Sequence, residues 1–214
     1  MRFPFAFAAL LLGVGLSGSA AVAQRDDPAG LHGPMSAQVR VCFVPAQQCD
    51  APIAAALHAA RQSVRVQAYG FTAPVILGAL GDAKERGVDV QVILDKSNDP
   101  SNRRDRTDDK PRLVGAQFTA AMGIPTWIDH RVAIAHNKVI IIDGKTVIGG
   151  SYNFTLSAEE RNAENVTFID STDLAKLYLA NWESRKAVSR VYIPPSSFDL
   201  GRAPALASAN TGQR

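Results

Sequence analysis

Strand-like apolar runs and helical stretches alternate over the first half of the chain. The runs are rich in β-branched residues, and the stretches between them carry the Ala and Leu content of helices. Gly87 follows the second stretch and is typical of a helix end. The order strand, helix, strand, helix, strand favours parallel strands joined by right-handed crossovers. We expect strands at 39–44, 64–71 and 88–94, and helices at 53–61 and 74–86.

The second half is richer in strands. Asp143-Gly144-Lys145 separates two β-rich runs, which is a strong hairpin signal. A later amphipathic helix carries Leu174, Leu177, Tyr178 and Trp182 at core spacing, so we interpret these as packing residues. We expect strands at 124–128, 136–142, 146–150 and 164–169, and helices at 113–122 and 173–188.

Length and composition indicate one folded domain. The chain has 214 residues, of which 46% are hydrophobic and 20% charged. The fold class that we predict is α/β, with a mixed, largely parallel β-sheet flanked by helices on both faces. Residues 38–190 form this domain, 24–37 a flexible lead-in, and 191–214 a disordered tail, because residues 194–214 are rich in Pro, Ser, Ala and Gly.

The N-terminus resembles an export signal. Arg2 precedes a nearly continuous apolar run, and Ala21-Val22-Ala23 has the small-x-small form of a signal peptidase site. We therefore expect residues 1–23 to be cleaved and the protein to be periplasmic or secreted, with no stable membrane insertion afterwards. An uncleaved anchor is the alternative, although the run is shorter than the roughly 20 residues that span a bilayer.

Export makes the two cysteines informative. Cys42 and Cys49 lie close in sequence, and an oxidising compartment favours a disulfide between them. Two free thiols, or half of a zinc site with His58, are the alternatives. The zinc reading is weak because no Cys-x-x-Cys pair accompanies these residues.

The charge balance is mildly basic. Lys and Arg number 23 against 20 Asp and Glu, a net charge of +3 with a pI of about 9.0. Residues 96–112 form a polar loop with six basic and four acidic side chains, directly after a predicted strand. Loops at that end of a strand often bind ligands, but a solvated insertion of mixed charge fits equally well.

The most informative segment surrounds the predicted hairpin. On a strand, His136 and Lys138 point to the same face. A two-residue turn sets either Ser151 opposite Lys138 with Asn153 opposite His136, or Ser151 opposite His136. Both registers gather an imidazole, an ammonium and a hydroxyl on one face, which suits a phosphate oxyanion.

These positions carry a family resemblance. His-x-Lys-x4-Asp-x6-Gly-Ser-x-Asn resembles the signature of the phospholipase D superfamily, here at His136, Lys138, Asp143, Gly150, Ser151 and Asn153. The order of the remaining elements is similar to the small single-motif bacterial nuclease branch. The resemblance covers about residues 38–188 and implies a phospholipase D-like domain.

The resemblance implies a metal-independent phosphodiesterase without a cofactor. In that family the histidine matching His136 forms a phosphohistidine, which water hydrolyses. The positions matching Lys138, Ser151 and Asn153 bind the phosphate, and Glu164 matches a carboxylate that hydrogen-bonds the imidazole. Such a carboxylate would fix the imidazole tautomer. Asp143 belongs to the catalytic motif, but its parity is opposite to that of His136, so we assign it turn hydrogen bonding or a salt link behind the site.

The motif count predicts a homodimer. Displacement at phosphorus needs both a nucleophile and a proton donor for the leaving oxygen, and the chain holds one motif. A two-fold axis would bring two copies of His136 together. The leading hypothesis is a nonspecific endonuclease of DNA, with RNA as a second nucleic acid substrate. The alternatives are a phospholipase and a nucleic-acid-binding dimer with a vestigial site.

Overall fold

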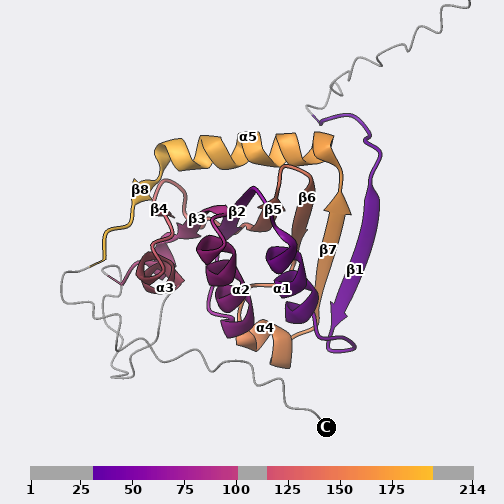
Figure 1. Cartoon of the computed structure of the whole chain (residues 1–214), viewed down its shortest axis with the longest axis horizontal. Helices are drawn as coiled ribbons and strands as arrows, with labels where there is room; N and C mark the ends of the chain where they lie inside the picture. Colours follow the sequence, from indigo (N-terminus) through magenta and orange to yellow (C-terminus); the bar gives the residue numbers. More distant parts are fainter. Residues whose placement is uncertain (1–30, 101–114, 195–214) are drawn as a thin grey trace, which may run out of the picture. The chain divides into compact units, whose positions relative to one another are not determined.

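The computed structural model describes residues 31–100 and 115–194, and these residues form an eight-stranded sheet in the order β1-β7-β6-β5-β2-β3-β4-β8 (Figure 1). All the helices and strands described belong to the compact unit Met35–Arg214. The strands are β1 Gln38–Val44, β2 Ser63–Ala68, β3 Asp89–Asp95, β4 Thr126–Asp129, β5 Lys138–Ile142, β6 Thr146–Gly150, β7 Glu164–Asp170 and β8 Arg190–Val191. The helices are α1 Asp50–Ala59, α2 Pro74–Glu85, α3 Gly115–Ala121, α4 Leu156–Arg161 and α5 Thr172–Val188, with a 3-10 turn at Lys96–Asn98.

The predicted mixed sheet with helices on both faces is confirmed, but "largely parallel" is wrong. Only the pairs β2–β3 and β3–β4 are parallel among the described strands, and the other five pairs are antiparallel. The meander β5, β6, β7 inserts between β1 and β2, so the first two strands are not neighbours. The short loop between β5 and β6 requires antiparallel neighbours, and the other strand pairs between β1 and β2 are antiparallel as well.

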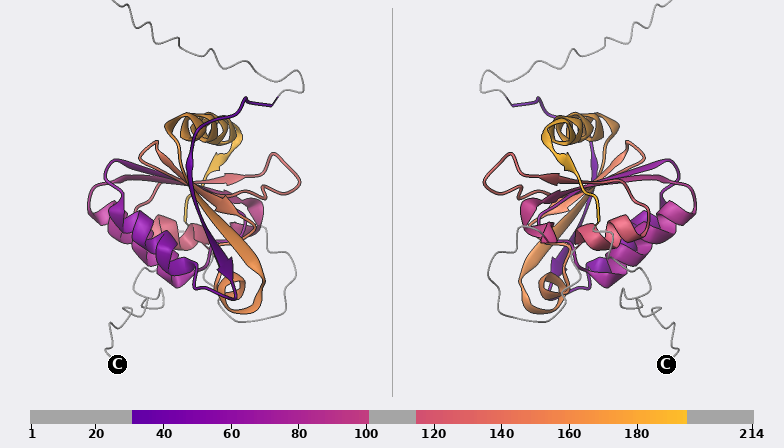
Figure 2. Two further views of the ribbon diagram at one scale, coloured as in Figure 1. Left: turned by 90° about the vertical axis from the view of Figure 1, so that its right-hand side faces the viewer. Right: turned by 90° about the vertical axis from the view of Figure 1, so that its left-hand side faces the viewer.

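The sheet separates two apolar cores. Ile140 and Ile142 of β5 enter the larger core under α1 and α2, while Val139 and Ile141 enter a smaller core with Trp182 of α5. This division follows from the alternation of side chains along a strand. Figure 2 shows α5 on one side of the sheet and α1 and α2 on the other. Leu174, Leu177 and Tyr178, expected in the core, are only half-buried.

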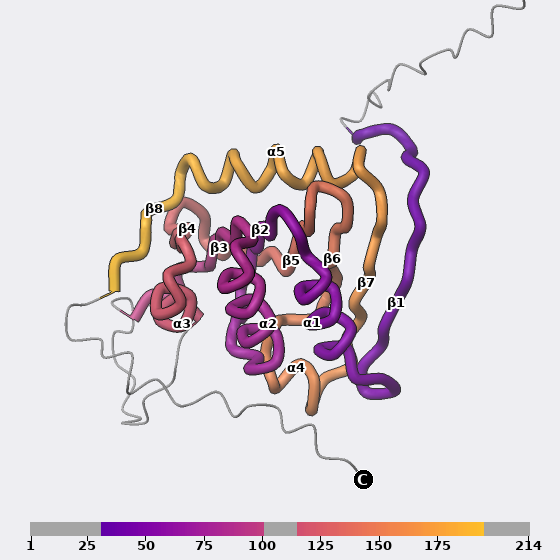
Figure 3. Tube along the Cα trace, in the orientation of Figure 1, coloured from indigo at the N-terminus to yellow at the C-terminus, as the bar shows by residue number. Residues whose placement is uncertain are grey.

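One part of the sheet stays open on the α5 side. Helix α5 packs on β2, β4, β5 and β6, whereas Val39, Val41 and Phe43 of β1 are 57%, 44% and 55% exposed. Val39 pairs with Ile169 of β7, and Val41 with Thr167, so these side chains share a face. Figure 3 shows β1 and β7 running side by side at this edge. We call these five residues the open sheet face.

The predicted disulfide is confirmed. Cys42 at the end of β1 is bonded to Cys49 at the start of α1, with an S–S distance of 2.03 Å. Half of a zinc site is therefore excluded. His58 instead lies 3.0 Å from the carboxylate of Asp82.

Three short elements were not predicted: the 3-10 turn Lys96–Asn98, helix α4 and strand β8. Helix α4 has 6 residues, too few for a periodic pattern, and it is capped by Thr155, whose Oγ accepts the amide of Ala158 at 3.1 Å. Strand β8 extends to Val191, the first residue of the predicted tail. The predicted signal 1–23, lead-in residues 24–30, loop residues 101–112 and tail residues 195–214 lie outside the described residues.

Candidate active site

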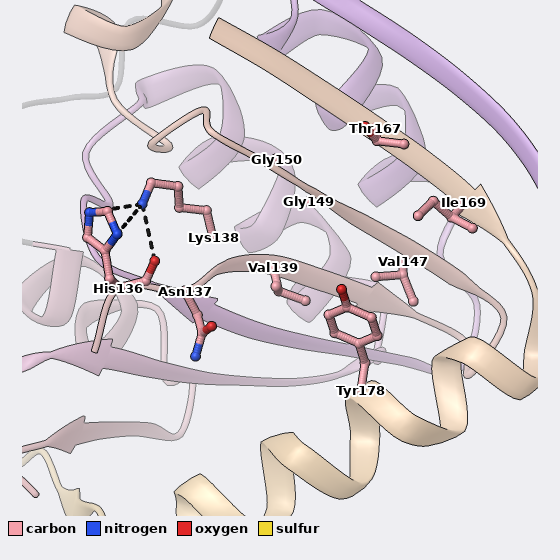
Figure 4. Close-up of a pocket in the computed structure, with 10 residues that line it drawn as sticks. All are labelled: His136, Asn137, Lys138, Val139, Val147, Gly149, Gly150, Thr167, Ile169 and Tyr178. Carbon is pink, nitrogen blue, oxygen red and sulfur yellow. Dashed lines mark hydrogen bonds between the residues drawn. The ribbon is translucent and has the colours of Figure 1, made fainter. Parts of the chain in front are cut away.

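His136 and Lys138 meet at the start of β5. The ammonium Nζ of Lys138 lies 3.3 Å from Nδ1 and 3.2 Å from Nε2 of His136, and 3.1 Å from its carbonyl oxygen (Figure 4). Lys138 is 8% exposed, whereas His136 is exposed. An ammonium only donates hydrogen bonds, so a ring nitrogen of His136 can accept one from Lys138 only when that nitrogen carries no proton. The pair thus presents an imidazole to solvent beside a fixed cation.

Lys138 is held in a place that disfavours its charge. Burial lowers the pKa of Lys138, and the negative charge of Glu164 opposes that change. A partly desolvated ammonium interacts more strongly with an anion than a solvated one does. The lysine therefore suits a phosphate oxygen better than an exposed lysine would.

Both predicted hairpin registers are wrong by one residue. Ile142 pairs with Thr146 and Val139 with Gly149, so a three-residue loop joins β5 to β6. The loop contains two left-handed residues, Asp143 at φ 53° and Gly144 at φ 60°. A two-residue type I′ turn on Asp-Gly also needs a positive φ at both residues, so the pattern Asp-Gly-Lys does not distinguish the expected two-residue loops from the observed three-residue loop.

Ser151 and Glu164 contact each other. The Ser151 hydroxyl donates to Oε2 of Glu164 at 2.5 Å and accepts the backbone amide of Asn165 at 3.1 Å. The other carboxylate oxygen of Glu164 accepts from Asn162 at 2.7 Å. Within the single chain, therefore, these Glu164 hydrogen bonds go to Ser151 and Asn162 and not to the ring of His136.

Asn153 is half-buried in the segment after β6. Its side-chain oxygen is buried without a hydrogen-bond partner among the described residues. Leaving a buried polar atom unpaired costs free energy, and a bound ligand could remove that cost. This observation supports a binding role for Asn153.

Asp143 lies at the opposite end of β5 from Lys138. Its carboxylate accepts the backbone amides of Arg61 at 2.9 Å, Gln62 at 2.8 Å and Ser63 at 2.9 Å. Burial alone would raise the pKa of Asp143, but these hydrogen bonds lower it overall. This is the turn hydrogen bonding expected of Asp143, and it ties the hairpin to the start of β2.

A pocket of about 350 Å³ adjoins the His136–Lys138 pair on the α5 side of the sheet. Its walls include Val139, Val147 and Tyr178, and Figure 4 shows Tyr178 reaching in from α5. Thr167 and Ile169 of the open sheet face also line it. The pocket therefore connects the candidate site to an apolar surface.

Sequence reasoning missed the support for the loop before His136. Asp95, 3% exposed at the end of β3, accepts the amide of Ala135 at 2.7 Å, and Lys96 donates to the carbonyl of Val132 at 3.0 Å. A carboxylate directly after a buried strand was a signal for Asp95. The missing information was which loop passes over that strand end.

Residues 31–100 and 115–194 are the part of the chain that the structure describes. They contain no group of three or more His, Cys, Asp or Glu side chains arranged to hold a metal ion. None of their helices is long and apolar enough to cross a bilayer.

The fold and site define a class: an α/β domain with an imidazole, an ammonium, a hydroxyl and a carboxylate near the ends of adjacent strands. The family described as "Cardiolipin synthase, PLD-like domain" matches residues 53–185. The chain belongs to this phospholipase D superfamily and is a phosphodiesterase of it.

The chain is similar to several known proteins. It is 44% identical to a phospholipase D of Rickettsia bellii over 150 residues, which cover 70% of each chain. The solved structure of the phospholipase D family member Nuc from Salmonella typhimurium is 35% identical, with a TM-score of 0.65, and the match covers 74% of this chain and all of that one. A mitochondrial cardiolipin hydrolase of Mus musculus is 32% identical over 130 residues, covering 60% of this chain and 53% of that one.

Proposed function

We propose that the protein is an exported, metal-independent endonuclease that cleaves DNA, and also RNA, without sequence specificity. The observation that carries the proposal is the exposed imidazole of His136 beside the buried ammonium of Lys138. The likeness to Nuc over that protein's whole length supports a nucleic acid substrate.

The reaction proceeds in two displacements at phosphorus. A ring nitrogen of His136 attacks the phosphodiester, the N–P bond forms, and the P–O bond to the leaving nucleotide breaks. Lys138 donates to a non-bridging oxygen, where negative charge accumulates. Water then attacks the phosphohistidine, the N–P bond breaks, and a phosphomonoester is released.

The leaving oxygen needs a proton that one chain does not readily supply. The hydroxyl of Ser151 already donates a hydrogen bond to Glu164, and the ammonium of Lys138 already contacts His136. In a two-fold dimer, His136 of the partner subunit donates this proton and takes one from water in the second step.

The open sheet face is the surface that we propose for dimerisation. Val39, Val41 and Phe43 are exposed there, and the adjoining pocket reaches His136. A second copy seated on this face would cover apolar area and bring its own site close to the first. The same contact would thus both stabilise the dimer and complete the site.

Export is part of the proposal. The apolar N-terminal run supports it, and the Cys42–Cys49 disulfide is of a kind that persists in oxidising compartments. The mature protein would then act in the periplasm or outside the cell.

A phospholipase is the second candidate. The pocket beside His136 has apolar walls, which would accommodate the apolar part of a lipid phosphodiester. The Rickettsia relative named phospholipase D supports this candidate.

The test uses purified mature protein in excess EDTA at neutral pH. Plasmid DNA, single-stranded DNA, RNA and phosphatidylcholine vesicles are incubated with the wild type, His136→Ala and His58→Ala. We expect nucleic acid cleavage by the wild type and by His58→Ala, whose histidine lies exposed beside Asp82. Hydrolysis of vesicles alone would favour the phospholipase, and cleavage by His136→Ala would overturn the mechanism.

A further inference from the structure

The segment 69–73 after β2 lies between the two stretches of chain that carry the candidate site. One stretch holds His136 and Lys138, and the other holds Asn153. The amide of Tyr69 donates to the carbonyl of Asn137 at 2.9 Å, next to His136 and Lys138. The amides of Thr72 and Ala73 donate to the carbonyl of Phe154 at 2.8 and 2.9 Å, next to Asn153. The segment therefore joins the stretch that carries the imidazole of His136 to the stretch that carries the side-chain amide of Asn153.

The ring of Tyr69 rests against the reacting pair. Its centroid is 4.9 Å from that of the His136 ring, with the planes tilted by 60°, and Nζ of Lys138 lies 5.8 Å from it. A tyrosine ring attracts a cation through its face and limits the rotation of a neighbouring ring. Tyr69 is itself fixed, because buried Asn98 donates to its carbonyl at 2.6 Å.

Gly70 leaves no room for a side chain. A Cβ at this position would lie 2.9 Å from Cγ2 of Thr155 and 3.3 Å from Cβ of Asn153. Both distances are shorter than ordinary van der Waals contact, so the Asn153 segment would have to move. Glycine is required here for space.

We propose that Tyr69 and Gly70 are positioning residues of the active site. Tyr69 orients the imidazole of His136 and steadies the ammonium of Lys138, and Gly70 allows Asn153 to approach the same phosphate. The inference rests on the proposed function in taking His136 as the nucleophile. It assigns a role to a segment outside the histidine-lysine motif.

The role of Tyr69 is tested with Tyr69→Phe and Tyr69→Leu. Phenylalanine keeps the ring, whereas leucine keeps only apolar bulk. With bis(4-nitrophenyl) phosphate, we expect kcat within about twofold of wild type for Tyr69→Phe and lower by about tenfold to a hundredfold for Tyr69→Leu, with KM little changed. A wild-type kcat in Tyr69→Leu would overturn the proposal.

An activity-independent readout accompanies the kinetics. The ring protons of His136, assigned by comparison with His136→Asn, should be shifted in the NMR spectrum by the ring current of Tyr69. Tyr69→Phe should keep this shift, and Tyr69→Leu should move the signal toward that of exposed His58. An unchanged signal in Tyr69→Leu would contradict the contact. If the wild type hydrolyses no phosphodiester, the proposed function fails, while this spectrum still decides whether the ring of Tyr69 holds the imidazole of His136.

The role of Gly70 is tested by a rescue. Gly70→Ala should lower kcat/KM by about tenfold or more, since sub-ångström displacement of a binding group is costly. Thr155→Ser removes Cγ2 but keeps the hydroxyl that caps α4. The double variant should recover most of the lost activity, with thermal unfolding followed to verify folding. The steric assignment would be overturned if Gly70→Ala had wild-type activity, or if the double variant were as impaired as Gly70→Ala alone.

Discussion

Lys138 is the first residue of β5 and Asp143 directly follows its last residue, and both have lowered pKa values for different reasons. Burial lowers the pKa of Lys138, which disfavours its charge. Backbone amides lower the pKa of Asp143, which favours its charge, against the opposing effect of burial. Lys138 is therefore suited to binding an anion, and Asp143 stabilises the turn.

Lys138 should set the alkaline limit of activity. Because its pKa lies below 10.5, the ammonium is lost at a lower pH than that of a free lysine, and kcat/KM should fall there. Lys138→Arg keeps the charge at all these pH values, so its alkaline limb should move upward even if its maximum is lower. Identical alkaline limbs in pH profiles of the two proteins would contradict this assignment.

The same shift has a consequence for stability. In the folded protein the lysine loses its proton more readily than in the unfolded chain, so the unfolded state binds more protons between the two pKa values. The contribution of Lys138 to the free energy of unfolding should therefore rise with pH in that window. Urea unfolding of wild type and Lys138→Met across alkaline pH would measure it.

Asp143 should contribute stability and not chemistry. Asp143→Asn places an amide donor against backbone amides, and we expect a loss of about 1 to 3 kcal/mol in the free energy of unfolding at pH 7. The wild-type advantage should disappear as pH falls from about 3.8 through the lowered folded pKa. Urea unfolding at pH 7 and pH 3 measures both. Equal stability at pH 7 would refute the role.

At the scale of elements, the Cys42–Cys49 disulfide joins β1 to α1 beside a polar network. Glu159 of α4 accepts the amide of Cys49 at 2.9 Å and the hydroxyl of Tyr152 at 2.9 Å. Burial and the neighbouring Glu159 raise the pKa of Tyr152, so the phenol remains a donor. Tyr152 stands between Ser151 and Asn153, and the network therefore supports the site from behind.

Reduction of this disulfide should destabilise the protein. The chain-entropy account of a loop this short gives a loss of about 2 to 3 kcal/mol in the free energy of unfolding. Urea unfolding with and without dithiothreitol measures the loss in the wild type. A Cys42→Ser/Cys49→Ser variant should not respond to the reductant, and a similar response there would show that the effect lies elsewhere.

Local patterns predicted the elements well and their neighbours poorly. The alternation of β5 and the boundary at Gly87 follow from local chemistry, and helix α2 ends at Glu85, close to the predicted 86. The insertion of β5, β6 and β7 between β1 and β2 depends on long-range pairing, which no local pattern encodes.

The candidate site divides in the same way. Strand parity predicted the proximity of His136 and Lys138, and the structure brings the two side chains into contact, although the predicted strand 136–142 begins only at Lys138 and His136 precedes it. The Ser151–Glu164 bond and the contact of Tyr69 with His136 join separate elements. Side-chain conformation decides such contacts, and spacing along the chain does not.

At the scale of the whole molecule, the open sheet face is an apolar surface that the described part of a single chain leaves uncovered. Apolar side chains on an edge strand are a liability unless something covers them. We expect Val41→Glu to dissociate the proposed dimer and to lower activity together with it, because a charge would be buried at the proposed contact. Sedimentation velocity beside DNA cleavage measures both quantities.

A control variant separates this effect from a general surface charge. Ala55→Glu places the same side chain on the exposed face of α1, on the other side of the sheet. It should remain dimeric and active. An active, monomeric Val41→Glu would refute the link between the dimer and catalysis.

The pairing of β1 with β7 also determines how much of the chain must be synthesised before the sheet can finish folding. Val44, near the beginning of the domain, pairs with Glu164, and Gln38 pairs with Asp170. During synthesis, the first strand must wait for the seventh, and contacts this distant in sequence form slowly. The residue opposite Val44 is Glu164, the partner of Ser151, so closing the edge of the sheet and setting the carboxylate are the same event. A partial chain can therefore hold the histidine and lysine without holding an assembled site.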